Sequence, residues 1–77
     1  MAVRELVDYV AKSLVEHPEQ VRVTTDYSGQ SVLVELEVAP DDMGKVIGKE
    51  GRIANAMRAL VKVAAAREGK RAVLDIV

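Results

Sequence analysis

Hydrophobic residues recur at helical spacing along residues 3–16, with charged residues on the opposite side. The apolar positions are Val3, Leu6, Val7, Val10 and Leu14. Steps of three and four residues place such side chains on one stripe, so the segment is predicted to be an amphipathic helix. His17-Pro18 is predicted to end it, because the residue before a proline is pushed out of the helical region.

Two runs with a period of two come next. The positions predicted to face the core are Val21, Val23, Thr25 and Tyr27, then Val32, Val34, Leu36 and Val38. Ser28-Gly29-Gln30 supplies a turn between them, so the two runs are predicted to form a β-hairpin. The polar residues between the apolar ones should point away from the core; they are Arg22, Thr24, Asp26, Glu35 and Glu37.

The stretch Ala39-Pro40-Asp41-Asp42 stops the second strand, and its aspartates are predicted to cap a short helix over residues 43–47. Gly48 ends that helix. A second helix is predicted from Arg52 onward. Its apolar positions are Ile53, Met57, Leu60 and Ala64, widened by Ala54, Ala56, Val61 and Val63. This arc covers about half of the helical wheel, so we expect the helix to be buried on more than one side.

The remaining face of this helix is a basic edge formed by Arg52, Asn55, Arg58 and Lys62. Gly69 is predicted to stop the helix, and alternation over residues 72–77 indicates a last strand. The predicted order is α-β-β-α-α-β, an α+β fold. We expect a single domain over residues 1–77, because a chain of this length cannot divide its apolar surface between two cores.

Composition removes several classes of site. The 77 residues include no cysteine and one histidine, so a disulfide framework, a thiolate metal site and a zinc site built from this chain alone are not expected. We expect no metal and no cofactor. No apolar stretch approaches the roughly 20 residues that span a bilayer, so the chain is expected to be cytoplasmic, with no membrane partner.

Charge is divided unevenly along the chain, although the formal net charge is only −1. Residues 1–44 hold nine acids against three bases, whereas residues 45–77 hold eight bases against three acids. A local basic patch attracts phosphate even on a slightly acidic protein, because charges beyond about 10 Å are screened at physiological salt. A solvated helix face lined with Lys and Arg explains the same charges equally well.

The most informative segment is Val46-Ile47-Gly48-Lys49-Glu50-Gly51-Arg52-Ile53, in which two glycines three apart join one helix to the next. Glycine permits tight backbone geometry and close approach. The helix that begins after the loop directs unpaired N–H groups and its positive dipole end at the turn, where a phosphate fits. Lys49 and Arg52 add charge, and Ile47 and Ile53 present apolar surface beside it.

In this segment the sequence resembles the KH family, and the element order is similar to the type II arrangement of bacterial KH domains. The resemblance extends over all 77 residues. It implies a three-stranded sheet packed on three helices, and about four nucleotides of single-stranded RNA held at the GXXG loop. The RNA contacts that it implies are Ile47, Gly48, Lys49, Gly51 and Ile53. We also expect Lys45, Glu50 and Arg52 to contact the RNA, because they lie beside these positions in the sequence. Glu50 departs from a purely basic loop and is expected to repel phosphate or to neutralise Lys49 in part.

Small stand-alone members of the family are known to pair with themselves and with a larger KH-containing RNA-binding protein. The resemblance therefore implies an RNA chaperone or post-transcriptional regulator linked to cell shape and cell wall biogenesis. A homodimer is expected on separate grounds, because a 77-residue domain with two aromatic residues has little core and small domains often gain stability by association. Ile53 and Met57 are the predicted interface residues, and pairing along an exposed strand edge is the alternative.

Two other function classes are weighed against RNA binding. An enzyme is not expected, because the glycines lack the spacing and the trailing Lys-Ser/Thr pair of a P-loop, and Asp41-Asp42 before a helix is typical of a cap. A protein-interaction or dimerisation module with little RNA binding is the serious alternative, because the apolar arc around Ile53 and Met57 also suits a symmetric interface. A steep salt dependence of RNA binding distinguishes the two.

Overall fold

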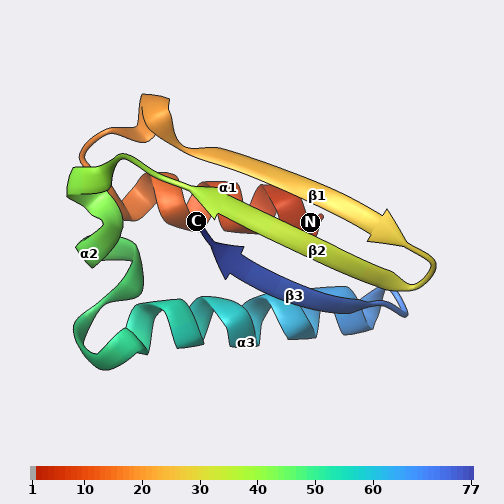
Figure 1. Ribbon diagram of the computed structural model, residues 1–77. Helices are drawn as coiled ribbons and strands as arrows, with labels where there is room; N and C mark the ends of the chain where they lie inside the picture. The colour runs from red at the N-terminus through yellow and green to blue at the C-terminus, as the bar shows by residue number, and fades with distance from the viewer. Residues whose placement is uncertain (1) are drawn as a thin grey trace.

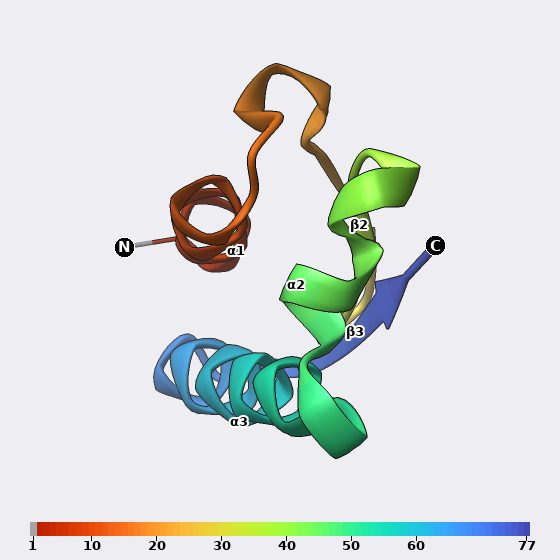
Figure 2. The ribbon, with the colours of Figure 1, turned by 90° about the vertical axis from the view of Figure 1, so that its left-hand side faces the viewer.

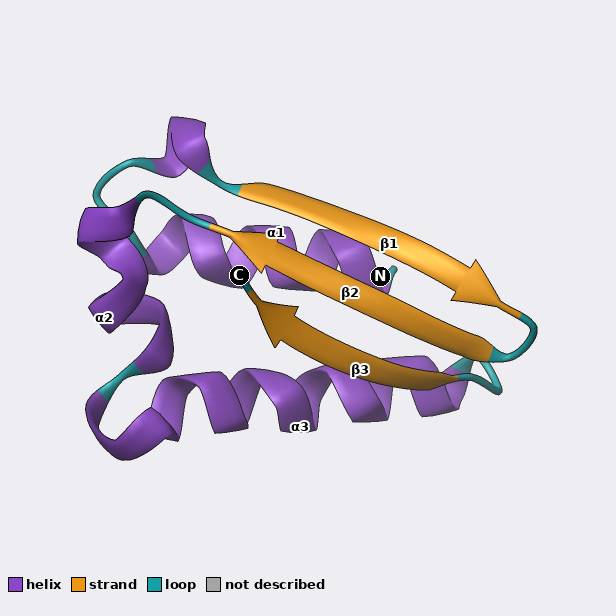
Figure 3. Ribbon diagram, viewed as in Figure 1, coloured by secondary structure: helices purple, strands orange, loops and turns teal. Residues whose placement is uncertain are grey.

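The computed structural model describes residues 2–77 and contains one mixed sheet with three α-helices (Figure 1; Figure 3). The elements are α1 (Val3–Leu14), η1 (Pro18–Gln20), β1 (Arg22–Ser28), β2 (Ser31–Glu37), η2 (Pro40–Asp42), α2 (Met43–Ile47), η3 (Lys49–Gly51), α3 (Arg52–Arg67) and β3 (Arg71–Ile76). The predicted order α-β-β-α-α-β is confirmed, apart from the short 3₁₀ turns η1, η2 and η3. The fold is the α+β fold expected of a type II KH domain.

The sheet has the order β1-β2-β3. β1 and β2 form the expected antiparallel hairpin, and the pairing of Ser28 with Ser31 leaves a two-residue turn at Gly29 and Gln30. β3 lies parallel to β2 on the other side. A parallel pair needs a crossover, and α2 and α3 supply it. Figure 2 shows α1 and α3 together on one side of the sheet.

The core lies between the sheet and the helices. On β2, Val32, Val34 and Leu36 are buried, while alternate residues, such as Leu33 and Glu37, face solvent on the open side of the sheet. This is the alternation that the period of two predicts. Helices therefore cover one face of the sheet, and the other face carries mostly polar and charged side chains, with Leu33 and Val73 exposed among them.

Two of the expected apolar stripes are rotated in the structure. On α1 the buried residues are Val3, Val7 and Ala11, and Leu14 is 37% exposed. The expectation that the helix after Gly51 is buried on more than one side is wrong. Only one face of α3 is covered, by α1, α2 and the sheet, and its buried residues are Ala54, Met57, Val61 and Ala65. Leu60 and Val63, which lie off that face, are 49% and 55% exposed.

Asp42 is not the simple helix cap that the sequence predicted. It precedes α2, but its carboxylate makes no cap hydrogen bond to that helix. Instead, the Glu16 N–H donates to Oδ1 and the His17 N–H donates to Oδ2, each at 3.0 Å. The side chain is fully buried. Asp42 therefore ties the chain just after α1 to the start of α2, and these bonds coincide with the end of α1 at Leu14.

The hydrogen bond from the Glu16 N–H lowers the pKa of the Asp42 carboxyl below its ordinary value; burial opposes this, and the His17 N–H adds to the lowering. A carboxyl whose folded pKa lies below its unfolded value stabilises the fold above the unfolded pKa of about 3.9. That contribution is lost as the pH falls through the folded pKa. Asp42 is therefore an acid-sensitive link between two distant parts of the chain.

Replacing Asp42 with Asn is expected to lower the melting temperature at pH 7 by at least about 5 °C, because a carboxamide offers one acceptor for two N–H donors. Asp41→Asn, at the exposed neighbouring position, is the matched control and should change little. Thermal unfolding followed by circular dichroism checks both. The gap between wild type and Asp42→Asn should narrow below about pH 4, and an equal loss in both variants would contradict this role.

Candidate nucleic-acid interface

The loop between α2 and α3 has a backbone that ordinary residues adopt with difficulty. Gly48 has φ 76° and ψ 174°, and Gly51 has φ 74° and ψ 15°. Glu50, between them, also has a positive φ of 58°. Positive φ is unfavourable for residues with a Cβ, so both glycines stand where the turn requires them. The loop reverses the chain within four residues and sets the start of α3.

Close approach is a second reason for glycine, and it applies only to Gly48. A Cβ at Gly48 would lie 2.7 Å from Cγ1 of Ile53, whereas a Cβ at Gly51 would meet nothing nearer than Asn55 Nδ2, at 3.8 Å. Ile53 therefore packs directly over the Gly48 backbone. The two glycines of the loop have different roles, one set by packing and conformation and the other by conformation alone.

The outward-pointing N–H groups expected at the turn are partly used inside it. The Gly48 N–H donates to the Gly44 carbonyl at 2.9 Å, and the Gly51 N–H donates to the Gly48 carbonyl at 3.2 Å. The Arg52 N–H donates to the Lys49 carbonyl. These bonds hold the loop in shape. Attraction for an anion at this end therefore comes from the dipole of the 16-residue helix α3 and from the side chains of Lys49 and Arg52.

The structure brings together three of the predicted charged residues and places the fourth elsewhere. Lys49, Glu50 and Arg52 are exposed at the loop, and Glu50 Oε1 lies 3.9 Å from the Arg52 guanidinium. The ion pair thus forms with Arg52, not with Lys49 as expected. Lys45 belongs to another group: its Nζ lies 3.1 Å from Glu16 Oε1 and 3.9 Å from Asp42 Oδ1. The exposed ion pair between Glu50 and Arg52 contributes little stability, so Arg52 and Lys49 stay available to an anion.

The apolar residues predicted beside the loop differ in exposure. Ile47 is 37% exposed, and Ile53 is partly buried against the core. Met57 is only 2% exposed and lies inside the core of this chain. The buried position of Met57 removes it as an interface residue, because α3 turns it toward the sheet. Ile47 and Ile53 remain as the apolar surface next to the charged loop.

A line of polar groups that the sequence did not reveal runs from the loop to the free edge of β3. Asn55 stands beside Gly51, and its Oδ1 accepts a hydrogen bond from Arg58 Nη1 at 3.3 Å. Arg58 Nε in turn donates to the carbonyl of Leu74 at 3.3 Å. The sequence placed Asn55 and Arg58 on one face of a helix, but only the tertiary packing of α3 against β3 shows what that face meets.

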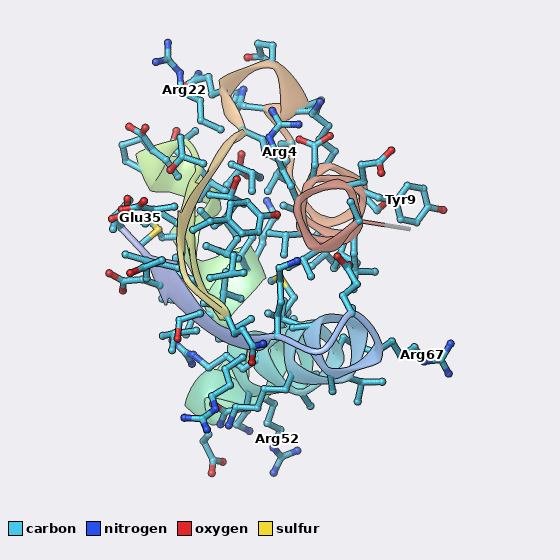
Figure 4. The ribbon with its side chains drawn as sticks, turned by 90° about the vertical axis from the view of Figure 1, so that its right-hand side faces the viewer. Arg4, Tyr9, Arg22, Glu35, Arg52 and Arg67 are labelled. Atoms are coloured by element: carbon cyan, nitrogen blue, oxygen red, sulfur yellow. The ribbon has the colours of Figure 1, made fainter. Side chains whose placement is uncertain are left out.

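Charge is separated between the faces of the molecule. Arg52 and Arg67 project from α3 into solvent, while Glu35 lies on the open side of the sheet, away from α1 and α3 (Figure 4). The side chains that share the open face with Glu35 include the acids Asp26, Glu37 and Asp75 and the bases Arg22 and Arg71. The open face thus carries four acids against two bases, whereas α3 carries four bases and no acid, so a polyanion is favoured at the loop and α3 over the sheet.

Residues 2–77 hold neither a candidate metal site nor a candidate membrane-spanning helix. Within this part of the chain, no three His, Asp or Glu side chains are grouped closely enough to hold a metal ion. None of the helices described there is both long enough and apolar enough to cross a bilayer.

Comparison with known proteins places this geometry in a family. A family model described as "KhpA/KhpB, KH domain" matches residues 4–76. RNA-binding protein KhpA of Caldanaerobacter subterraneus subsp. tengcongensis is 55% identical over 73 residues, 95% of this chain and 97% of the relative. RNA-binding protein KhpA of Clostridium perfringens is 53% identical over 74 residues, 96% of this chain and 99% of the relative.

Among solved structures, the fold resembles part of Era in a complex with MgGDPNP and nucleotides 1506-1542 of 16S ribosomal RNA. The TM-score is 0.67 at 17% identity, over 96% of this chain and 28% of the Era chain. At this identity the similarity concerns the fold alone. The full-length identity to curated relatives and the family match over nearly every residue are stronger, and by them the chain is a member of the KhpA/KhpB family of KH-domain proteins.

Proposed function

We propose that this chain binds single-stranded RNA, holding about four nucleotides along the loop Gly48–Gly51 and the first turns of α3. The observation that carries the proposal is the loop itself: two glycines with positive φ turn the chain at the start of a long helix, with Lys49 and Arg52 exposed beside them. Curated relatives more than half identical to this chain are named RNA-binding proteins.

Each part of the loop has a chemical role in this proposal. The phosphate backbone approaches at Gly51, where a Cβ would meet nothing nearer than 3.8 Å, while Gly48 gives the loop its shape and leaves room for Ile53. The α3 dipole favours the negative charge of the phosphate. Lys49 and Arg52 donate charge-assisted hydrogen bonds to phosphate oxygens. Ile47 and Ile53 provide an apolar wall for unstacked bases. Glu50 weakens the clamp, because its carboxylate lies within 3.9 Å of the Arg52 guanidinium and competes with phosphate for it.

Single-stranded RNA is expected to bind better than a duplex of equal length, because a backbone clamp beside an apolar wall requires bases that are free of their partners. Fluorescence anisotropy with one labelled octamer, alone and annealed to its complement, measures the difference. About three neutralised phosphates predict micromolar affinity and a slope of log affinity against log salt of roughly −2. A preference for the duplex, or a slope near zero, would refute the proposal.

The wider role that we propose is that of an RNA chaperone or post-transcriptional regulator acting with a larger KH-containing partner. Four nucleotides give little affinity and little sequence information. Joining two weak RNA-binding modules raises the apparent affinity by the effective concentration of the second module, without any new contact within the first. A small domain of this kind therefore benefits from a partner that carries further RNA-binding surface.

A second candidate function is a protein-interaction module, alone or beside RNA binding. One observation favours it: an open, mostly apolar groove of about 580 Å³ lies between α1 and α3, lined by Ala2, Leu6, Leu60, Val63, Ala64, Arg67 and Glu68. Exposed apolar patches of this kind are typical of contact surfaces. The groove and Ile53 are separate positions on α3, so either one, or both, can contact a second copy of the chain.

A homodimer is expected by sedimentation-velocity ultracentrifugation at tens of micromolar protein. Ile53→Asp should return the chain to a monomer if the contact is at the loop end of α3, and Leu60→Asp should do so if the contact is at the groove. Lys62→Asp, at an exposed polar position of the same helix, is the control. Circular dichroism verifies folding of each variant. A monomeric wild type would refute pairing with itself.

A further inference from the structure

Arg58 is held in a fixed position at the junction of α3 and β3. Its Nε donates to the Leu74 carbonyl, and its Nη1 donates to Asn55 Oδ1, both at 3.3 Å. Bonds at two points of a planar guanidinium fix both the position and the plane of the group. Because Asn55 stands beside Gly51, the two side chains continue the interface from the phosphate-binding loop to the edge of the sheet.

The side of β3 that Arg58 touches is a free edge. The Arg71 N–H donates to the Gln30 carbonyl and the Val77 N–H donates to the Leu36 carbonyl, so these amides of the β3 segment face β2. Alternation along a strand directs the backbone groups of Leu74 to the opposite edge, where Arg58 meets its carbonyl. α3 runs alongside β3 at this edge (Figure 1). A base that continues from the loop along α3 therefore meets the guanidinium next.

The two hydrogen bonds leave donors unused. A guanidinium has five N–H groups, and here one on Nε and one on Nη1 are bonded, so the second N–H of Nη1 and both of Nη2 remain. Adjacent donors on Nη1 and Nη2 match two adjacent acceptors in one plane. Arg58 is only partly buried, so this pair is open to a ligand.

We propose that Arg58 reads one base of the bound RNA and selects bases that present two adjacent acceptors. Guanine offers O6 and N7 on its Hoogsteen edge, and cytosine offers O2 and N3 on its Watson–Crick edge. On adenine and uracil, acceptors alternate with donors along the base edge, so these bases accept from only one of the two donors on Nη1 and Nη2. This assignment rests on the proposed RNA function and adds to it a base preference and the residue that sets it.

A phosphate contact would use the same two donors, and the experiment separates it from base reading. Four labelled RNA octamers share an adenine background and differ at two positions: AAGAAGAA, AACAACAA, AAUAAUAA and AAAAAAAA. Because the test base occurs twice in each octamer, a test base can reach Arg58 in more than one register of the RNA on the loop. Wild type, Arg58→Lys, Arg58→Gln and the control Lys62→Gln are compared by fluorescence anisotropy, with melting temperatures measured for each.

The wild type is expected to bind the guanine or the cytosine octamer at least about fivefold more tightly than the uracil and all-adenine octamers, the low end for a bidentate contact. Arg58→Lys keeps the charge but lacks the fork, and should reduce this ratio to below about twofold. Lys62→Gln should lower all four affinities slightly and keep the ratio. Whichever of the guanine and cytosine octamers binds more tightly identifies the base edge that Arg58 contacts.

Several results would overturn the assignment of Arg58. A wild type that binds all four octamers equally, or a preference that survives Arg58→Lys, excludes base reading by this residue. An equal loss on all four octamers in both arginine variants assigns the group to phosphate. A chain that binds none of the octamers refutes the proposed RNA function itself, which is a different failure and is seen in the wild type alone.

Discussion

Replacing Lys49 and Glu50 together by aspartate is expected to lower the affinity for single-stranded RNA by roughly 10- to 100-fold. A charge-assisted hydrogen bond contributes about 1.5–3 kcal/mol, and the new carboxylate at position 49 repels phosphate as well. Both side chains are exposed, and aspartate tolerates the positive φ of position 50 better than most residues. The fold should therefore be unchanged by circular dichroism.

Two matched variants make the result specific to the loop. Arg22→Asp introduces the same change of charge on β1, and because Arg22 lies away from α3 it should leave RNA affinity nearly unchanged (Figure 4). Glu50→Lys reverses the opposing charge and should tighten binding several-fold, since it removes a carboxylate that repels phosphate beside Arg52 and adds a cation. A double aspartate variant that binds RNA as the wild type does would show that the loop is not the clamp.

Gly48→Ala is expected to destabilise the fold by about 2–4 kcal/mol, a fall in melting temperature of roughly 10–20 °C. At φ 76° and ψ 174° the backbone of Gly48 lies in a region that is essentially restricted to glycine. The added Cβ would also lie 2.7 Å from Ile53 Cγ1, so Ile53 has to move out of its packed position. RNA binding should weaken with it, because Ile53 belongs to the proposed apolar wall.

The other glycines of this region provide graded controls. Gly51→Ala meets only the conformational cost of a positive φ, about 1–2 kcal/mol, because the nearest atom to its Cβ is 3.8 Å away. A Cβ at Gly44 has open space in α2, so Gly44→Ala should be neutral or slightly stabilising. Thermal melts rank the three. Equal stability of the Gly48 and Gly44 variants would contradict the packing argument.

The element order was predictable because the hydrophobic periodicity and the positions of turn-forming and helix-ending residues agree along this chain. Alternation marked β1 and β2, three- and four-residue spacing marked α1 and α3, and Gly48 marked the end of α2. The buried side of α3 was not predictable in the same way. Its apolar arc is wide, and sequence alone does not show which part of the arc the sheet covers, so Leu60 was expected inside and is 49% exposed.

Long-range partners were the part that sequence could not supply. Asp42 was predicted to cap the nearest helix, since a local cap is the commonest role of an aspartate before a helix. Its carboxylate oxygens instead accept hydrogen bonds from backbone amides 25 and 26 residues away. Lys45 was assigned to RNA, yet its nearest charged partner is Glu16. Arg58 was recognised as basic, but its bond to Leu74 depends on how α3 lies against β3. Each depends on contacts between segments that only folding brings together.

Amide chemical-shift mapping tests the proposed binding of RNA at the loop Gly48–Gly51 most directly. A single-stranded RNA octamer is titrated into the ¹⁵N-labelled protein at low salt, and the amide signals are followed by NMR. The proposal predicts the largest changes at Gly48, Lys49, Gly51 and Arg52, with those of β1 nearly unmoved. Changes centred on the open face of the sheet or on the groove between α1 and α3, with the loop amides unmoved, would contradict it.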